Sequence, residues 1–554
     1  MCGFLITAGA AAITPAPSLH ARGPDQQGHA ASCGVDLRSF RLSIVGQATG
    51  AQPTRHGTSI LVYNGEIYNF RELAAAYELS DLARDSDTHC LHELIEKLTV
   101  QAAVPLLVGH FAFACLDERS RTIFFCRDHM GVKPLCFRHE AGQLAVSSDV
   151  RTLADSTPNN IDSMAALEAI IFGGHTGEGT LYSTIRTAEP GVLYAYDIRS
   201  DRLTRHSVSL PSRVDPGDEE LYELIAGSVR EQAAISVPGV CLVSSGIDSR
   251  IVKALVPAGQ PMLFLNAVSE QLAFNPEDRN YDADTVPFEV TTDPSRDSFT
   301  DMLLAYGTVP AHNNYFALCV LYAQLSPKSR IHTPEHIKVA LTGEGADEYF
   351  GGYGRYRQLC AHLEGGEVPW VAALQSLSPR WLYLMNTRLH HSSLAWLRQR
   401  GVDVSAIADY HVARTTCDLS APPALESLSR YDVQTNLRYG LHKQDTAGMN
   451  SSVEVRVPMV TQAIHRCAVD GSMAAATATI PKLRLQTVAA RLGIHQHTKI
   501  GFPVSLETFV PHAYRPSAAL QDRFPFARET EMPREIRTSL YMLDTLRRSF
   551  AVAA

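Results

Sequence analysis

The sequence is poor in basic charge and in charge overall. Lysine and arginine together number 49, against 58 for aspartate and glutamate, which gives a formal net charge of −9. Because binding to nucleic-acid phosphates needs a concentrated basic surface, this balance argues against a nucleic-acid-binding protein. Charged residues make up 19% of the chain and hydrophobic residues 45%, a composition typical of globular proteins. At roughly 150 residues per domain, the 554 residues predict two to four domains.

Three further features are absent. No CxxC pair occurs among the eleven cysteines, so a local zinc or iron–sulfur motif is missing, and the scattered cysteines predict reduced thiols in the cytoplasm. No lysine or arginine precedes Arg22, so the apolar stretch 4–13 lacks the basic flank of a signal peptide. We expect a buried strand there, ending at the prolines that follow. No stretch approaches the roughly 18 apolar residues of a membrane span.

The N-terminal part has the pattern of a β-rich domain. Short apolar runs predict strands at 41–45 and 59–63, and the runs 111–116 and 122–126 predict a β-hairpin. The spacing of apolar residues in 88–98 predicts a helix. The stretch 200–220 is polar and contains proline and glycine, which favours a linker.

After this stretch, predicted strands and helices alternate. Helices are expected at 219–234 and 250–256, and strands at 240–243, 262–268 and 337–341. Two of the strands are followed by loops rich in glycine and small residues. This order predicts an α/β parallel sheet that binds ligands at its strand ends. From about residue 360 the composition favours helices.

Cys2 is the first candidate catalytic residue. It follows the initiator methionine, and its neighbour Gly3 is small. Removal of Met1 would leave Cys2 with a free α-amine, which can act as a base for its own thiol. Taken alone, a cysteine at this position is more often structural.

Several motifs in the first 200 residues accompany Cys2 in a characteristic order. They are Arg22-Gly-Pro-Asp25, Arg41, Tyr63-Asn64-Gly65-Glu66, Asp87, Gly109-His-Phe-Ala-Phe113 and Arg127-Asp-His-Met-Gly-Val-Lys-Pro134. This region resembles the class II glutamine amidotransferase domain of glutamine-hydrolysing asparagine synthetases. The resemblance implies an α+β N-terminal-nucleophile hydrolase with an αββα sandwich, over residues 1–205.

The resemblance also implies roles for the residues around Cys2. Asn64, through its side-chain amide, and Gly65, through its backbone N–H, would form an oxyanion hole, with each donor worth about 3 kcal/mol. Arg41 would bind the glutamine carboxylate and Asp87 its α-ammonium. Taken on its own, Asn-Gly at 64–65 is more typical of a type I′ hairpin turn, and Cys2 and the flanking motifs favour the oxyanion hole instead.

The loop 243–250 carries serines, a glycine and Asp248 between a predicted strand and a predicted helix, and such a loop can wrap a phosphate. It is similar to the SGGxDS loop of ATP pyrophosphatases, although Ser245 and Arg250 depart from the usual residues. An ordinary helix N-cap is the alternative. A second loop, 341–352, resembles a segment of asparagine synthetases, as do 452–458 and 498–502.

By this resemblance, residues 215–554 form an asparagine synthetase-like ATP-pyrophosphatase domain with a helical C-terminal part. Asp248 and Asp347 would bind Mg²⁺, Glu344 would face an acyl-adenylate and act on ammonia, and Lys499 would stabilise the pentavalent phosphorus. The ATP site would comprise Leu242, Ser244, Ser245, Gly246, Asp248, Ser249, Asn266, Thr342 and Gly343.

Together these inferences predict a carbon–nitrogen ligase that uses glutamine, ATP and a small carboxylate acceptor and releases AMP and pyrophosphate. Aspartate is the default acceptor. Thr446 stands where the family usually has a basic residue, so an acceptor from natural-product or envelope-sugar chemistry is the alternative, with neutral drift equally open. A non-catalytic regulatory relative is a third reading. We expect a cytoplasmic protein without nucleic-acid or membrane partners, and the sequence leaves a homodimer open.

Overall fold

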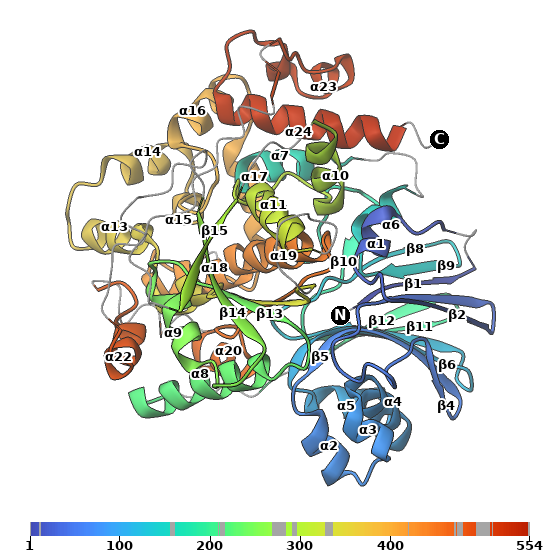
Figure 1. Ribbon diagram of the computed structural model, residues 1–554. Helices are drawn as coiled ribbons and strands as arrows, with labels where there is room; N and C mark the ends of the chain where they lie inside the picture. Colours follow the sequence, from blue (N-terminus) through green and yellow to red (C-terminus); the bar gives the residue numbers. More distant parts are fainter. Residues whose placement is uncertain are drawn as a thin grey trace.

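The computed structural model of the chain describes residues 2–551 with the exception of 10–12, 156–160, 209, 211–215, 269–283, 291–295, 327–335, 419, 470–472, 474–479, 495–509 and 512. The N-terminal half contains two antiparallel sheets, and the C-terminal half contains a parallel sheet surrounded by helices (Figure 1). None of the helices in the described ranges is long and apolar enough to cross a membrane.

The two sheets of the N-terminal half have six strands each. The first has the order β10-β8-β9-β1-β3-β2, with β1 Cys2–Ala8, β2 Gln26–Ser32, β3 Val35–Arg41, β8 Cys136–Glu140, β9 Gln143–Ser147 and β10 Arg186–Thr187. The second has the order β12-β11-β7-β6-β5-β4, with β4 Thr54–His56, β5 Ser59–Ile67, β6 Gly109–Asp117, β7 Thr122–Arg127, β11 Val192–Asp197 and β12 Arg202–Ser207.

Alternating side chains pack these sheets face to face. Phe4 and Ile6 of β1 point into the core between the sheets and meet Ile60 and Val62 of β5. Leu61, the residue between the last two, points to the opposite face. Because successive strand residues face opposite sides, both faces of each sheet need a cover.

Helices supply those covers. The second sheet is covered by α2 Phe70–Ala76, α3 Asp81–Asp85, α4 Asp87–Leu98, α5 Val100–Ala103 and the 3₁₀ turn Val104–Leu106 (Figure 1). The first sheet contacts α1 Pro17–Ala21 and α6 Val150–Asp155, and α7 Ser163–Phe172 leads away from it. The predicted αββα sandwich is therefore confirmed, as are the hairpin at 111–126 and the helix at 88–98.

Three local predictions differ from the structure. The run 41–45 is not a strand, because β3 ends at Arg41 and the apolar side chains Leu42 and Ile44 are buried against the C-terminal half instead of pairing in the sheet. The first strand ends at Ala8, well before the prolines. The expected linker 200–220 is shorter, because its first residues form β12 and pair with β11.

The C-terminal half contains a five-stranded parallel sheet of order β15-β14-β13-β16-β17. Its strands are β13 Gly239–Leu242, β14 Met262–Val268, β15 Thr285–Glu289, β16 Val339–Leu341 and β17 Glu454–Arg456. Because all five strands are parallel, their carboxyl ends meet at one edge. The predicted strands at 240–243, 262–268 and 337–341 are confirmed.

Helices cover both faces of this sheet and form the rest of the half. They are α8 Asp218–Ala233, α9 Ile247–Leu255, α10 Arg296–Tyr306, α11 Tyr315–Leu325, α12 Ala346–Phe350, α13 Gly354–Leu363, α14 Pro369–Leu377, α15 Trp381–Leu384, α16 His391–Gln399, α17 Val404–Val412, α18 Leu425–Gln434, α19 Asn436–Met449, α20 Gln462–Ala468, α22 Leu483–Arg491, α23 Ala518–Arg523 and α24 Arg534–Ala551, with a 3₁₀ turn at Pro525–Arg528. The expected helical character beyond residue 360 is confirmed.

The two halves share a packed interface. Arg22 forms a two-pronged ion pair with Asp445, at 2.8 and 3.2 Å, and Lys338 Nζ lies 2.7 Å from Asp25 Oδ2. The hydroxyl of Ser452 also donates to the carbonyl of Ala21, at 2.6 Å. Two hydrophobic clusters contain residues from both halves. The interface therefore fixes the position of Cys2 relative to the parallel sheet.

Candidate active sites

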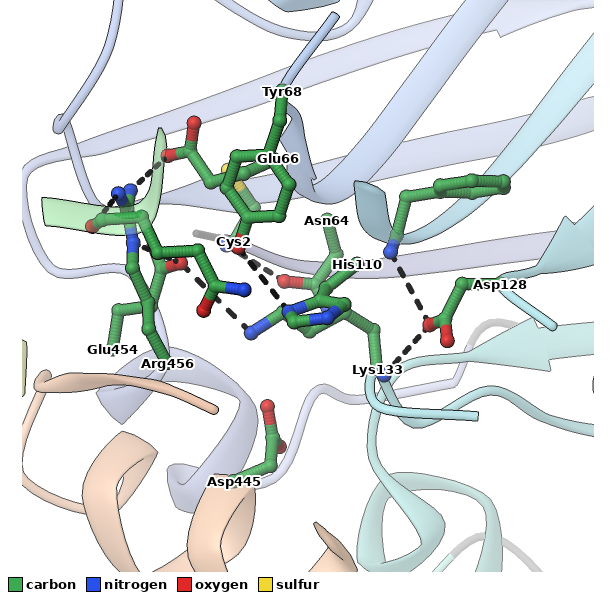
Figure 2. Close-up of polar contacts among 12 residues, drawn as sticks. Cys2, Asn64, Glu66, Tyr68, His110, Asp128, Lys133, Asp445, Glu454 and Arg456 are labelled. Atoms are coloured by element: carbon green, nitrogen blue, oxygen red, sulfur yellow. Dashed lines mark hydrogen bonds and ion pairs between the residues drawn. The ribbon is translucent and has the colours of Figure 1, made fainter. Parts of the chain in front are cut away.

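Cys2 and Asn64 meet at the interface side of the two antiparallel sheets. The backbone N–H of Cys2 donates to Asn64 Oδ1 at 3.0 Å (Figure 2). This contact orients the amide, and Asn64 Nδ2 is left buried without a hydrogen-bond partner in the described part of the chain. An unsatisfied buried donor beside a thiol is suited to receive developing negative charge.

Gly65 continues β5 and does not form the hairpin turn that Asn-Gly also allows. The strand runs from Ser59 to Ile67, so the type I′ alternative is wrong. Gly65 has φ +138°, and a Cβ at this position would collide with the carbonyl oxygen of His110. The close approach of β6 therefore requires glycine here.

The charges of Arg41 and Asp87 both act on the Cys2 thiol. Arg41 pairs with Cys2 across β1 and β3, and its guanidinium donates to the carbonyls of Val45, Gly46 and Gln47 at 3.2, 2.6 and 3.1 Å. Burial raises the pKa of the Cys2 thiol, and the positive charge of Arg41 opposes this shift. The thiol is therefore protonated at neutral pH and needs a base.

Asp87 begins α4 with a buried carboxylate. It accepts hydrogen bonds from the Tyr63 hydroxyl at 2.8 Å and from the N–H groups of Ile67 and Thr88 at 3.2 and 2.8 Å. Burial raises the pKa of Asp87, and these hydrogen bonds counteract the shift. The structure thus brings together Cys2, Arg41, Asp87 and the Asn64-Gly65 pair.

Gln52 is a residue of this site that no sequence motif marks. Its Nε2 donates to Cys2 Sγ at 3.5 Å, and its Oε1 accepts from the backbone N–H of Tyr63 at 2.7 Å. It precedes β4 and reaches Cys2 only through the tertiary fold, so a local pattern could not have found it.

A buried ionic network joins this site to the parallel sheet (Figure 2). Arg456 Nη2 lies 3.1 Å from Glu66 Oε1, and Arg456 Nε donates to Glu454 Oε1 at 3.0 Å. Burial raises the pKa of Glu66 to about 8 despite the opposing charge of Arg456. The carbonyl of Arg456 accepts from the N–H of Thr342 at 3.1 Å. Arg456 therefore contacts both Glu66, which follows Gly65 of the first centre, and Thr342, one of the expected ATP-binding residues.

The loop after β13 is closed by its own serines. Ser249 Oγ accepts from the N–H of Ser244 at 2.9 Å and donates to the carbonyl of Gly246 at 3.1 Å. On the neighbouring strand, Asn266 Nδ2 donates to the Val243 carbonyl at 2.8 Å, while its buried Oδ1 has no hydrogen-bond partner among the described residues. This arrangement leaves a hydrogen-bond acceptor beside the carboxyl end of β13.

The loop after β16 approaches the first loop closely. A Cβ at Gly343 would lie 2.7 Å from the Cβ of Asp248. Asp248 at the start of α9 and Asp347 at the start of α12 both contact Lys482 Nζ, at 2.5 and 2.7 Å. The two carboxylates therefore converge on the ammonium group of Lys482. Their oxygen atoms are also the kind of donor that Mg²⁺ prefers.

Lys482 is the second site residue that the sequence analysis missed. It has φ 55°, directly precedes α22, and is buried. A single lysine in an apolar and basic segment carries no distinctive pattern. Lys499, which the resemblance assigns to the phosphates, lies outside the described residues. Within the described ranges, no group of three or more His, Cys, Asp or Glu side chains could hold a metal ion.

Glu344 lies between the second loop and α19. Lys443 Nζ lies 3.1 Å from its Oε2, and Gln444 Nε2 donates to the same oxygen at 2.6 Å. Burial alone would raise the pKa of Glu344, but Lys443 and Gln444 hold it below its usual range. Glu344 is thus a carboxylate at neutral pH. Thr446 lies one turn of α19 beyond Lys443, and its hydroxyl lies 3.5 Å from His442 Nδ1.

Comparisons with known proteins agree with this pair of sites. Residues 2–207 match the model of the glutamine amidotransferase domain, and residues 321–518 match that of asparagine synthase. A protein of Mycobacterium tuberculosis is 28% identical over 88% of this chain and 82% of its own. Asparagine synthetase [glutamine-hydrolyzing] 1 of Bacillus subtilis is 25% identical, over 88% of this chain and 82% of its own. Asparagine synthetase B of Escherichia coli is 30% identical over 60% of this chain and 59% of its own.

The class of protein follows from the two matched models. The chain is an amidotransferase in which an N-terminal glutaminase-type domain precedes an ATP-dependent synthetase domain. Both halves are similar to those of glutamine-hydrolysing asparagine synthetases, and the chain is a carbon–nitrogen ligase of that type.

Proposed function

We propose that the chain transfers the amide nitrogen of glutamine to a carboxylate that it first activates with ATP. The observation that carries this proposal is the presence of two separate polar centres in halves that pack against each other: Cys2 beside the unsatisfied Asn64 amide, and the Asp248–Asp347 pair on the loops that also carry Glu344. We place the boundary between the two domains between residues 205 and 215.

In the first centre, Cys2 attacks the side-chain carboxamide of glutamine. After removal of Met1, the α-amine of Cys2 takes the thiol proton, and the Asn64 oxygen that accepts from this nitrogen holds the amine in place. Asn64 Nδ2 and the Gly65 N–H donate to the developing oxyanion. Arg41 and Asp87 bind the carboxylate and ammonium of the substrate. Ammonia leaves, and water releases glutamate from the thioester.

In the second centre, the acceptor carboxylate attacks the α-phosphate of ATP and releases pyrophosphate. Mg²⁺, held by Asp248 and Asp347, would neutralise charge on the polyphosphate. Lys482, which contacts both carboxylates, would move off them to supply a second positive charge to the polyphosphate when Mg²⁺ binds, and Lys499 is the residue that the family resemblance adds. Glu344 takes a proton from ammonia as it displaces AMP.

The ATP pocket is assigned to the ends of β13, β14 and β16. Leu242, Gly343 and Asn266 line the nucleoside side. The hydroxyl and N–H groups that bind phosphate oxygens come from Ser244, Ser245, Gly246, Ser249 and Thr342, while Asp248 is on the Mg²⁺ side of the same loop. The open Oδ1 of Asn266 is available to accept a hydrogen bond from the base.

Aspartate is the acceptor that we propose first. A different acid is the second candidate. Thr446 is buried on α19, the helix that also carries Glu344's partners Lys443 and Gln444, and it is neutral where the family usually has a basic residue. The test is AMP release with glutamine and ATP across a panel of carboxylic acids. Aspartate-dependent AMP supports the first candidate, and AMP released only with another acid supports the second.

We also place the enzyme in the cytoplasm. All eleven cysteines are free, which suits a reducing compartment that also supplies ATP and glutamine. A reactive Cys2 thiol needs the same reducing conditions. Fractionation of cells that express the native chain tests this placement.

A further inference from the structure

A cavity of about 140 Å³ is lined by residues of both halves. Its wall combines the segment 127–136, the loop after α7, residues 305–308 and one face of α19, and Figure 1 shows α19 beside β10 at this junction. Its wall includes Arg22, whose Nε lies 3.4 Å from the Cys2 carbonyl, and Thr446 of α19, but none of the described residues that we assigned to catalysis, glutamine, ATP or Mg²⁺. Since a water molecule takes up about 30 Å³, the cavity has room for a small organic molecule.

Two guanidinium groups face this cavity. Arg127, at the end of β7, is 7% exposed, and its Nε has no hydrogen-bond partner in the described part of the chain. Arg438, near the start of α19, is half-buried, and no hydrogen bond or ion pair joins its side chain to a described residue. Burial, and then the nearby charge of Arg438, lowers the pKa of Arg127 to about 10. Two like charges are thus held together in a poorly solvated space, an arrangement that an anion would relieve.

The other charged groups of the wall already have partners. Arg22 is paired with Asp445, and His175 Nδ1 lies 2.9 Å from Glu168. Asp149 accepts three hydrogen bonds from neighbouring hydroxyl and amide groups. Burial lowers the pKa of His442, so its imidazole is neutral. The wall therefore holds two guanidiniums whose side chains have no hydrogen-bonded carboxylate among the described residues, although the charges of Asp128 and Glu189 act on Arg127 and Arg438 from a distance. With the hydrogen-bonded carboxylate of Asp149 also in the wall, this balance favours a ligand with a single negative charge.

The remaining wall suits the rest of an organic acid. The hydroxyl of Tyr439 is buried in the wall and has no hydrogen-bond partner among the described residues, so it is available as a third donor. Val132, Leu135 and Leu181 contribute apolar surface. A tetrahedral dianion would leave excess negative charge beside Asp149 and would not use this surface.

We propose that the cavity binds a small organic monocarboxylate, with its head group held by Arg127, Arg438 and the Tyr439 hydroxyl. Its short carbon chain lies against Val132, Leu135 and Leu181. A guanidinium matches a carboxylate with two parallel hydrogen bonds, and enclosure strengthens each of them. Because the wall belongs to both halves, the bound acid joins the glutaminase side to the synthetase side. This inference does not depend on the proposed reaction.

The test is the thermal unfolding of the full chain at constant ionic strength and near-neutral pH, with butyrate, acetate, phosphate or chloride. Butyrate is expected to raise Tm with a saturable dependence, acetate to act more weakly, and chloride to have no saturable effect. Loss of a saturable response to butyrate, or saturation by phosphate alone, overturns the carboxylate assignment.

Variants locate the response. Arg438→Gln should weaken butyrate binding about tenfold to a hundredfold, which is the range for one charge-assisted contact. Arg438→Lys keeps the charge without the fork and should give an intermediate affinity. Arg41→Gln, at the Cys2 centre, should keep the response.

Without added acid, Arg438→Gln should unfold at the same temperature as the parent chain or higher, because it removes an uncompensated charge. A lower Tm without acid would show that Arg438 stabilises the fold, and equal butyrate affinity in the parent and in Arg438→Gln would show that the acid binds elsewhere. Either result overturns the proposal.

Discussion

Replacing Asp445 by alanine should destabilise the chain strongly, because it leaves the Arg22 guanidinium buried at the interface without its counter-ion. The side chains of Arg22 and Asp445 are 6% and 2% exposed, and two hydrogen bonds of 2.8 and 3.2 Å join them. Removing one partner of such a buried pair costs about 3–5 kcal/mol. Arg22 Nε also lies 3.4 Å from the Cys2 carbonyl, so the loss should reach the glutaminase centre.

The assay is urea unfolding of the parent chain and of Asp445→Ala, with a second ion pair as control. Asp36→Ala removes the partner of Arg38 at 2.9 Å, where the two side chains are 32% and 34% exposed, and should cost about 1 kcal/mol or less. The double variant Arg22→Met with Asp445→Leu should be more stable than Asp445→Ala, because no charge is left unpaired. A cost for Asp445→Ala no greater than that of Asp36→Ala would refute the reasoning.

The same variant tests how ammonia is transferred. If the packed interface shields the path from Cys2 to Glu344, the parent chain should form nearly one amide per glutamine hydrolysed, with little dilution by isotopically labelled external ammonium. Asp445→Ala should lower this ratio and increase incorporation of the label. Full exchange with external ammonium in the parent chain would contradict an enclosed path.

Three further outcomes are expected. Asp248→Ala or Asp347→Ala should abolish acceptor-dependent release of AMP and pyrophosphate while glutamine hydrolysis continues, and ADP and phosphate as products would exclude the pyrophosphatase assignment. Thr446→Arg should change the acceptor profile across a panel of acids, and an unchanged profile would favour neutral drift at this position. Glu66→Gln should become more stable relative to the parent chain as the pH rises from about 4.5 to about 8, because the folded-state pKa of Glu66 is raised and its stabilising proton is lost over that window. A stability difference independent of pH would contradict the raised pKa.

The sequence was most informative where the chemistry depends on local motifs. The short segments around Cys2, Asn64-Gly65 and Asp87 predicted the members of the first centre, and the two loops after β13 and β16 predicted the convergence of Asp248 with Asp347. Each of these residues lies within or directly beside the strand or helix that positions it, but its role was predicted from the family resemblance of several motifs in order, since each motif alone also fitted a structural role.

The remaining contacts depend on tertiary structure. Gln52 reaches Cys2, and Lys482 reaches Asp248 and Asp347, across long sequence separations and without a recognisable pattern. The run 41–45 misled the strand prediction because Leu42 and Ile44 satisfy their hydrophobicity at the interface between the halves. An apolar alternation shows which side chains are buried, but not which surface buries them.

The central claim is that Cys2 releases from glutamine the ammonia that the second centre consumes. The most direct measurement is amide formation by Cys2→Ala with ATP and the acceptor, supplied with glutamine in one reaction and with ammonium in the other. The account predicts that glutamine-dependent amide formation is lost, while ammonium-dependent formation stays at the level of the parent chain. Equal loss of both activities, or retention of the glutamine-dependent one, would contradict it.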